Sequence, residues 1–239
     1  MGYWDDAGKV GYKNMIFASE RFGTYLREAS FKFTRELIRE INISKNGRAL
    51  DLGCGDGDLS AEVLSKEFDF VKAIDISAPA IDYAKKRQLQ NVSFEVGDIC
   101  QFNELKISGG KWHCVFMMGI LHHVKENASQ IVNNVSKLTD YVIVQEPNGN
   151  NIGRKLLELL PAYRAAGENS FHKKDLLHIF ESNGYFACGI REFNIFPNMT
   201  PEFIYSTLKR LNYIIEMTPL IQTLCTIRIF AFKKHHCQS

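Results

Sequence analysis

The chain has 239 residues, a length that suits one domain with a sizeable buried core. Apolar residues make up 45% of the chain and charged residues 23%, as in ordinary soluble enzymes. The net charge of +2 argues against a strongly basic nucleic-acid-binding protein, although such a total says nothing about a local charged patch.

The first residues, MGYWDDAGKVGYKN, have no apolar core behind a basic start, so they do not resemble a secretory signal. Residues 15–42 then carry apolar side chains at helical spacing and predict one or two amphipathic helices. Beyond them the pattern alternates, in this order: strand 48–52, helix 58–66, strand 70–75, helix 77–88, strand 92–96, strand 114–117, helix 126–138 and strand 141–145.

After residue 150 the pattern changes to a helical stretch and loop over 151–170, followed by a helix at 173–182 and a strand at 186–193. Further helices are predicted from Thr200 to Thr223, and a last strand at 227–232. The most apolar stretch, 211–232, contains two charged residues and a proline, which argues against a transmembrane helix.

Short apolar strands alternating with helices of about ten residues predict an α/β fold. We expect a Rossmann-like, doubly wound and mostly parallel sheet with helices on both faces, N-terminal helices and a C-terminal helical insertion. No two of the six cysteines have CxxC spacing, so we expect no metal and free thiols in a cytoplasmic protein.

The strongest motif is Leu50-Asp51-Leu52-Gly53-Cys54-Gly55-Asp56-Gly57, between a predicted strand and a predicted helix. Its glycines let the backbone approach a ligand closely, and the helix that follows points its first amides at that ligand. A dinucleotide fingerprint would place its third glycine at position 58, which is aspartate here. The acidic residues of the turn suit a ligand with a cationic ammonium and sulfonium better than a pyrophosphate.

Two further acidic positions suit an adenosine-containing ligand. Asp75 ends the second strand, where an acid typically bonds ribose hydroxyls, and Ile76 beside it is placed to pack on the adenine. Asp98 follows the third strand and offers an acceptor for the adenine amino group, with Ile99 as an apolar contact. Taken alone, Asp75 could equally be a helix cap and Asp98 part of a surface turn.

A fourth motif, Met117-Met118-Gly119-Ile120-Leu121-His122-His123-Val124, follows the fourth strand. In order, DLGCGDG, AIDIS, VGDI and MGILHHV resemble class I S-adenosylmethionine (SAM)-dependent methyltransferases of the small-molecule type, methyltransferase type 11/12-like, over about residues 45–150. The resemblance implies SAM as cofactor. It assigns the methionine part of SAM to the turn from Gly53 to Gly57, the ribose to Asp75, the adenine to Asp98 and Ile99, and the methionyl chain to Met118.

The same resemblance implies one methyltransferase domain over residues 1–239. Residues 1–45 would form a helical lid in which Tyr3, Trp4 and Tyr12 are candidates, 46–150 the SAM-binding core, and 151–239 the acceptor-binding region and final strands. Aromatic side chains of the last region are candidates for an acceptor pocket, namely Tyr163, Phe171, Phe196, Phe203 and Tyr205.

A hydroxyl acceptor needs a base, and His122, His123, Glu146 and His172 are the candidates. Packing at a helix start is an alternative role for the His122-His123 pair. We expect a small-molecule acceptor and no nucleic-acid partner, because the motifs of amino-group DNA methyltransferases and protein-arginine methyltransferases are not seen. The alternatives are a Rossmann-type NAD(P)-dependent oxidoreductase and a non-catalytic SAM-binding regulatory protein.

Overall fold

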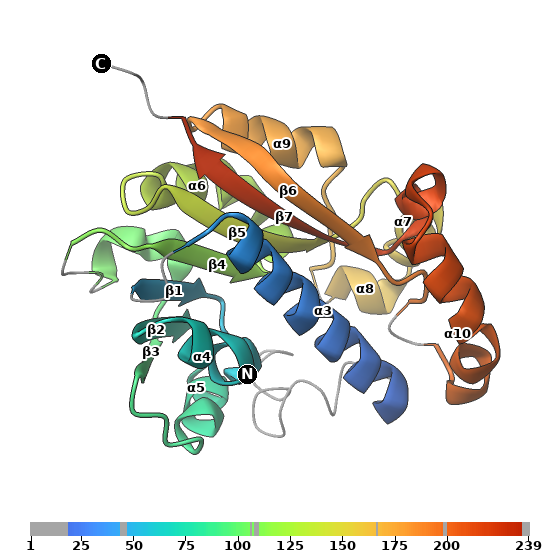
Figure 1. Ribbon diagram of the computed structural model, residues 1–239, viewed down its shortest axis with the longest axis horizontal. Helices are drawn as coiled ribbons and strands as arrows, with labels where there is room; N and C mark the ends of the chain where they lie inside the picture. Colours follow the sequence, from blue (N-terminus) through green and yellow to red (C-terminus); the bar gives the residue numbers. More distant parts are fainter. Residues whose placement is uncertain are drawn as a thin grey trace.

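The computed structural model describes residues 19–43, 47–105, 107, 110–165, 167–197 and 200–235. Its centre is a seven-stranded sheet in the order β3-β2-β1-β4-β5-β7-β6 (Figure 1). The strands, in chain order, are β1 (Arg48–Leu52), β2 (Phe70–Asp75), β3 (Val92–Val96), β4 (Cys114–Met118), β5 (Tyr141–Pro147), β6 (Tyr185–Phe193) and β7 (Ile227–Lys234).

Strands β1 to β5 are parallel, whereas β7 lies antiparallel between β5 and β6. The expected mostly parallel α/β sheet is therefore confirmed. From β1 the chain continues to β2 on one side of the sheet centre, and from β4 it continues to β5 on the other side. Such a reversal of strand order opens a crevice at the carboxyl ends of the two central strands, where open α/β sheets bind ligands.

Alternate residues of the strands face opposite sides of the sheet and build two hydrophobic clusters. Cys114 and Phe116 of β4 belong to the cluster covered by α3 (Glu20–Glu40), together with η1 (Ser60–Leu64) and α10 (Glu202–Glu216). Val115 and Met117 belong to the opposite cluster, covered by α6 (Ala128–Val135) and α9 (Lys173–Glu181). Apolar residues on both faces explain why the strands read as nearly continuous apolar runs.

Shorter helices connect these layers: α4 (Ser65–Glu67), α5 (Ala78–Lys85), η2 (Ile99–Glu104), η3 (Leu121–Asn127), α7 (Ile152–Leu157), α8 (Pro161–Ala165) and η4 (Pro219–Leu224). Ser77 caps α5 as its position predicts, accepting a hydrogen bond from the Ala80 amide. In the described residues, no helix is both long and apolar enough to cross a membrane.

Several helices differ from the sequence-based expectation in their internal geometry. The helix predicted over 58–66 widens to π-helical hydrogen bonding from Ser60 to Leu64. The one predicted over 126–138 begins earlier, as a 3-10 turn from Leu121, and becomes α-helical only at Ala128. Apolar periodicity near four residues does not distinguish these tighter and wider helices from an α-helix.

Candidate active site

A cavity of about 770 Å³ opens at the carboxyl ends of the parallel strands. This volume lies in the range of small-molecule sites and would hold a nucleoside with space left over. Of the residues that the sequence assigned to the cofactor or to a catalytic base, twelve line it, namely Asp51, Gly53, Cys54, Gly55, Asp75, Ile76, Asp98, Ile99, Met118, His122, His123 and Glu146. Gly57 and His172 do not line it.

The glycine turn after β1 adopts a left-handed backbone at Gly53 (φ 75°) and Gly57 (φ 77°). A Cβ on Gly53 would lie 2.6 Å from Ile120 Cγ1, so the turn packs directly against the loop that follows β4. A Cβ on Gly57 would lie 2.7 Å from Phe94 Cε1, inside the protein. Gly57 is therefore required for packing of the turn against β3 and does not face the cavity.

Asp51 lies at the base of the cavity, where its carboxylate accepts a hydrogen bond from the Ser60 hydroxyl at 2.6 Å. Burial raises the pKa of this carboxyl to about 7, against the opposing effect of the Ser60 bond. A buried acid of this kind gains stability as an anion when a cationic group binds beside it. Asp51 thus fits a ligand carrying a positive charge.

The Asp75 carboxylate holds the glycine turn in place, accepting hydrogen bonds from the Gly55 amide at 2.8 Å and the Ser77 amide at 2.9 Å. Asp98 caps η2, accepting from the Cys100 amide at 2.8 Å. Both side chains thus hold local backbone in place while still lining the cavity, and the cap of α5 is Ser77 and not Asp75. Ile76 presents an exposed apolar side chain at its edge.

Glu146, near the end of β5, is almost completely buried and organises the start of η3. Its carboxylate accepts from the Leu121 amide at 2.9 Å and the His122 amide at 3.2 Å, and it pairs with His122 Nδ1 at 2.7 Å. Burial by itself would lower the pKa of the His122 imidazole, but the charge and hydrogen bond of Glu146, with Glu168 adding to them, raise it to about 9. At neutral pH His122 is therefore an imidazolium and has no free lone pair with which to act as a base.

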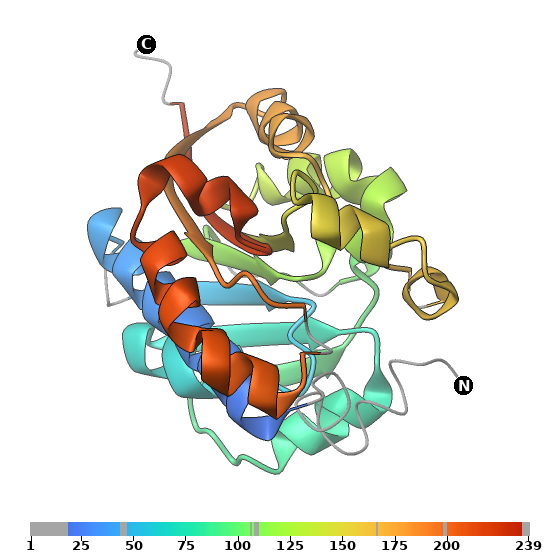
Figure 2. The same cartoon turned by 90° about the vertical axis from the view of Figure 1, so that its right-hand side faces the viewer.

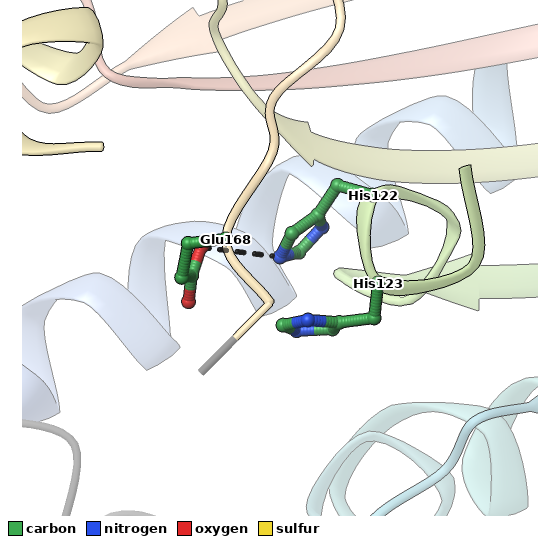
Figure 3. Close-up of side chains that lie close together, drawn as sticks. All are labelled: His122, His123 and Glu168. Carbon is green, nitrogen blue, oxygen red and sulfur yellow. Dashed lines mark ion pairs between the residues drawn. The ribbon is translucent and has the colours of Figure 1, made fainter. Parts of the chain in front are cut away.

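The other ring nitrogen of His122 faces Glu168, whose Oε2 lies 3.3 Å from Nε2 (Figure 3). Arg154 of α7 forms a second ion pair with Glu168. Burial would raise the pKa of the Glu168 carboxyl, but the hydrogen bond and charge of His122, with those of Arg154, lower it to about 2. Glu146, His122, Glu168 and Arg154 thus form a continuous ion-pair network from β5 to α7.

Ligand atoms of His122, His123 and Glu168 lie within 4.8 Å of one another, a spacing that a metal ion could bridge. The network argues against that use, because the Arg154 guanidinium already occupies Glu168 and Glu146 already holds His122. We therefore describe the cluster as a set of ion pairs.

His123 lies beside His122 with the ring centroids 3.9 Å apart. Burial, reinforced by the charge of His122, lowers the pKa of His123 to about 4. The neighbouring histidines therefore differ in charge at neutral pH, and of the two it is His123 that is neutral and could accept a proton.

The remaining cavity wall comes from three parts of the chain that lie far apart in sequence. Leu26 and Phe31 of α3, Leu157 of α7, and Phe196 with Thr226 near β6 and β7 line it. Of the aromatic residues expected in an acceptor pocket, Phe196 lines the cavity, Phe171 and Tyr205 are buried in the two core clusters, and Phe203 is exposed.

Tyr163 of the same set lies under the Arg154 guanidinium, 5.3 Å from its ring centroid. His172 is exposed at the start of α9 and does not line the cavity. Tyr3, Trp4 and Tyr12 lie outside the described residues.

Comparison with known proteins agrees with this geometry. Residues 43–184 match a family model described as a methyltransferase domain. The chain is 24% identical over 161 residues to 27-O-demethylrifamycin SV methyltransferase of Amycolatopsis mediterranei, covering 62% of this chain and 53% of that protein. It is 30% identical over 156 residues to "Probable cobalt-precorrin-6B C(15)-methyltransferase (decarboxylating)" of Methanococcus maripaludis, covering 54% of this chain and 86% of the relative.

Among solved structures, magnesium protoporphyrin IX methyltransferase from Synechocystis PCC 6803 with bound SAH superimposes with a TM-score of 0.62 at 20% identity, covering 89% of this chain and 85% of that one. The chain spans 53% of the length of the rifamycin methyltransferase and 24% of the length of another curated relative that it matches. Because the family model covers more than half of the chain and the sheet has the same architecture as the solved neighbour, the protein belongs to the methyltransferase domain family and has the class I SAM-dependent methyltransferase fold.

Proposed function

We propose that this protein transfers the methyl group of SAM to a small-molecule acceptor. The observation that carries the proposal is the gathering of the glycine turn, Asp75, Asp98 and the His122-His123 pair around one cavity at the strand reversal. The curated relatives and the solved neighbour named above are methyltransferases of small molecules, which supports the acceptor class without specifying it.

The described residues fit SAM in charge and shape. Asp51, Asp75 and Asp98 make this end of the cavity acidic, which suits the ammonium and sulfonium of SAM. We assign the ribose to Asp75, the adenine to Asp98 with Ile76 and Ile99 against its faces, and the methionine part to Gly53–Gly55 with Asp51, Cys54 and Met118. Gly57 supports this turn from behind and is not assigned a ligand contact.

Bound SAM would supply an electrophilic methyl group, and the protein would mainly position the acceptor and exclude water. The acceptor side of the cavity would be built by 151–239 together with α3, which extends the expected acceptor region towards the N-terminal part of the chain. Within it, Leu26, Phe31 and Phe196 offer apolar contact and the Arg154–Glu168 pair offers polar contact.

The three catalytic candidates take different roles in this proposal. Glu146 and the cationic His122 would position the loop after β4, since the two ring nitrogens of His122 are engaged by Glu146 and Glu168. His123, being neutral, would accept the proton of a hydroxyl or ammonium acceptor, although a pKa of about 4 makes it a weak base. So weak a base favours an acceptor that is already deprotonated, such as a carboxylate or an acidic phenol.

Two measurements test the proposal. Calorimetric titration with SAM and with NAD distinguishes a methyltransferase from a nicotinamide-dependent oxidoreductase. We expect saturable binding of SAM and no binding of NAD. Incubation with SAM labelled in its methyl group and a panel of carboxylates, phenols and amines then tests transfer. Tight SAM binding without transfer to any of them would favour a SAM-binding regulatory protein.

A further inference from the structure

Large apolar side chains are exposed on α10, outside the cavity. Phe203, Ile214 and Met217 are 70%, 57% and 65% exposed. At about 3.6 residues per turn, these three fall on one side of the helix. The opposite side packs into the protein through Tyr205, Asn212 and Ile215. Helix α10 therefore has one side buried in the fold and large apolar side chains exposed on the other.

A second apolar surface lies on the segment from α7 to α8. Ile152, Leu156 and Leu159 are exposed there and line a shallow groove on the outer side of the His122–Glu168 pair. Figure 2 shows α10 and the α7–α8 segment on the same side of the molecule, flanking the ends of the central strands. We call these surfaces together the apolar face: Phe203, Tyr213, Ile214 and Met217 of α10, and Ile152, Leu156 and Leu159 of the α7–α8 segment.

The acidic side chains of these segments already have partners within the fold. Glu202 binds Ser19 and Arg21, and Glu216 accepts from the Asn194 amide at 2.7 Å. Glu158 pairs with Arg154 and Lys155. The carboxylates of α10 and of the turn after α7 are therefore occupied within the fold, those of Glu202 and Glu158 by basic side chains and that of Glu216 by hydrogen-bond donors.

Three basic side chains of the same helices are placed differently. Lys209 and Arg210 of α10 and Arg164 of α8 are exposed, and none of them forms a side-chain ion pair or hydrogen bond with a described residue. Arg210 lies between Phe203, Ile214 and Met217 around the helix. The apolar face therefore carries outward positive charge although the chain as a whole is nearly neutral.

We propose that the apolar face docks on the surface of an anionic lipid bilayer. Large apolar side chains with Arg and Lys among them are the pattern of helices that lie in the membrane interface. A bilayer also accommodates two separate apolar ridges, which a single complementary groove on a protein would not. Since no described helix can span a membrane, the contact is with the surface, and it does not depend on the proposed methyl transfer.

The test is sedimentation of the full-length protein with vesicles of phosphatidylcholine alone and of phosphatidylcholine mixed with phosphatidylglycerol. We expect sedimentation with the mixed vesicles, weakened by high salt. The double variant Phe203→Ser/Ile214→Ser should bind at least about tenfold more weakly, because two large side chains that would enter the bilayer are lost. Lys209→Glu/Arg210→Glu should bind at least about twenty-five-fold more weakly at low salt, at about fivefold for each basic residue removed.

Matched controls lie away from the apolar face. Val96→Ser removes an exposed apolar side chain from edge strand β3, and Lys85→Glu reverses an exposed charge on α5; both should bind vesicles like the wild type. Circular dichroism checks that each variant is folded. Absence of sedimentation with mixed vesicles, or equal binding by all four variants, would overturn the proposal. So would a wild-type dimer that Phe203→Ser/Ile214→Ser converts to monomer, since the face would then bind a second copy.

Discussion

His122 Nδ1 lies 2.7 Å from Glu146 Oε2, and this pair fixes both the charge of the imidazole and the position of the loop after β4. Two backbone amides of the same loop also donate hydrogen bonds to the Glu146 carboxylate. A histidine held in this way is a poor base at neutral pH, and both of its ring nitrogens already face carboxylates. The pair is therefore better suited to fixing the loop at the cavity wall than to deprotonating an acceptor.

Replacing Glu146 by glutamine should lower the pKa of His122 from about 9 to below neutrality, because burial then acts without its main opposing charge. Glutamine retains the side-chain shape, so the loop should stay in place at a cost of about 1–3 kcal/mol in unfolding free energy. NMR titration of the His122 ring measures the change. Glu168→Gln is the comparison and should lower this pKa less, since Glu146 contributes more to it. Equal shifts in the two variants would contradict this ranking.

The raised pKa of His122 also predicts how stability depends on pH. The imidazole titrates near 9 in the folded protein and near 6.5 when unfolded, so its charged form favours folding. That contribution is complete below pH 6.5 and is lost as the pH rises through 9. Denaturant unfolding of wild type and His122→Gln should therefore show a stability difference that shrinks across this interval. His178→Gln, which changes an exposed histidine of α9, is the control. A difference that stays constant would mean that His122 is not charged in the fold.

Asp75→Asn tests the assignment of the ribose. The variant keeps the shape of a side chain that accepts from the Gly55 and Ser77 amides but loses its charge. Loss of a charge-assisted hydrogen bond should weaken SAM binding by about 1.5–3 kcal/mol, roughly tenfold to a hundredfold in Kd by calorimetry. Asp82→Asn, an exposed change on α5, should leave the affinity unchanged. An unaltered Kd in folded Asp75→Asn would remove Asp75 from the cofactor site.

Alanine variants at two glycines distinguish the cost of backbone strain from the cost of a steric collision. Gly184 (φ 81°) has open space around an added Cβ, so Gly184→Ala should cost only the left-handed strain of about 1–2 kcal/mol. Gly57→Ala meets the same strain and also Phe94 at 2.7 Å, which should add about 1–3 kcal/mol. Denaturant unfolding of both variants measures the difference. Equal losses would show that the turn shifts away from Phe94 at little cost.

Much of the sheet could be predicted from sequence because its strands are buried on both faces. Residues 48–52, 70–75 and 92–96 form strands with the predicted bounds, and the other four strands differ by one or two residues at their ends. Continuous apolar runs between glycine-rich turns carry this information locally. The order of the strands and the antiparallel direction of β7 depend on contacts between segments far apart in the sequence, so a local pattern does not predict them.

The cavity residues after the strands could be anticipated for the same reason, since the ends of parallel strands meet at one edge. Arg154 and Glu168 could not, because their importance rests on pairing with each other and with His122 across separate loops. Gly57 shows what glycine spacing leaves open. Its spacing indicates a ligand-binding glycine, whereas its surroundings are the ring of Phe94 and the methyl group of Ala84.

The antiparallel direction of β7 has a practical result for every experiment above. Lys233 pairs with Tyr141 at the amino end of β5, so the described chain finishes at the end of the sheet remote from the cavity, as Figure 1 shows. Ser19, in contrast, binds Glu202 and precedes Glu20, which lines the cavity mouth. A fluorophore attached at His235 would therefore lie remote from the cavity, whereas one attached at Ser19 would lie next to a residue that lines it.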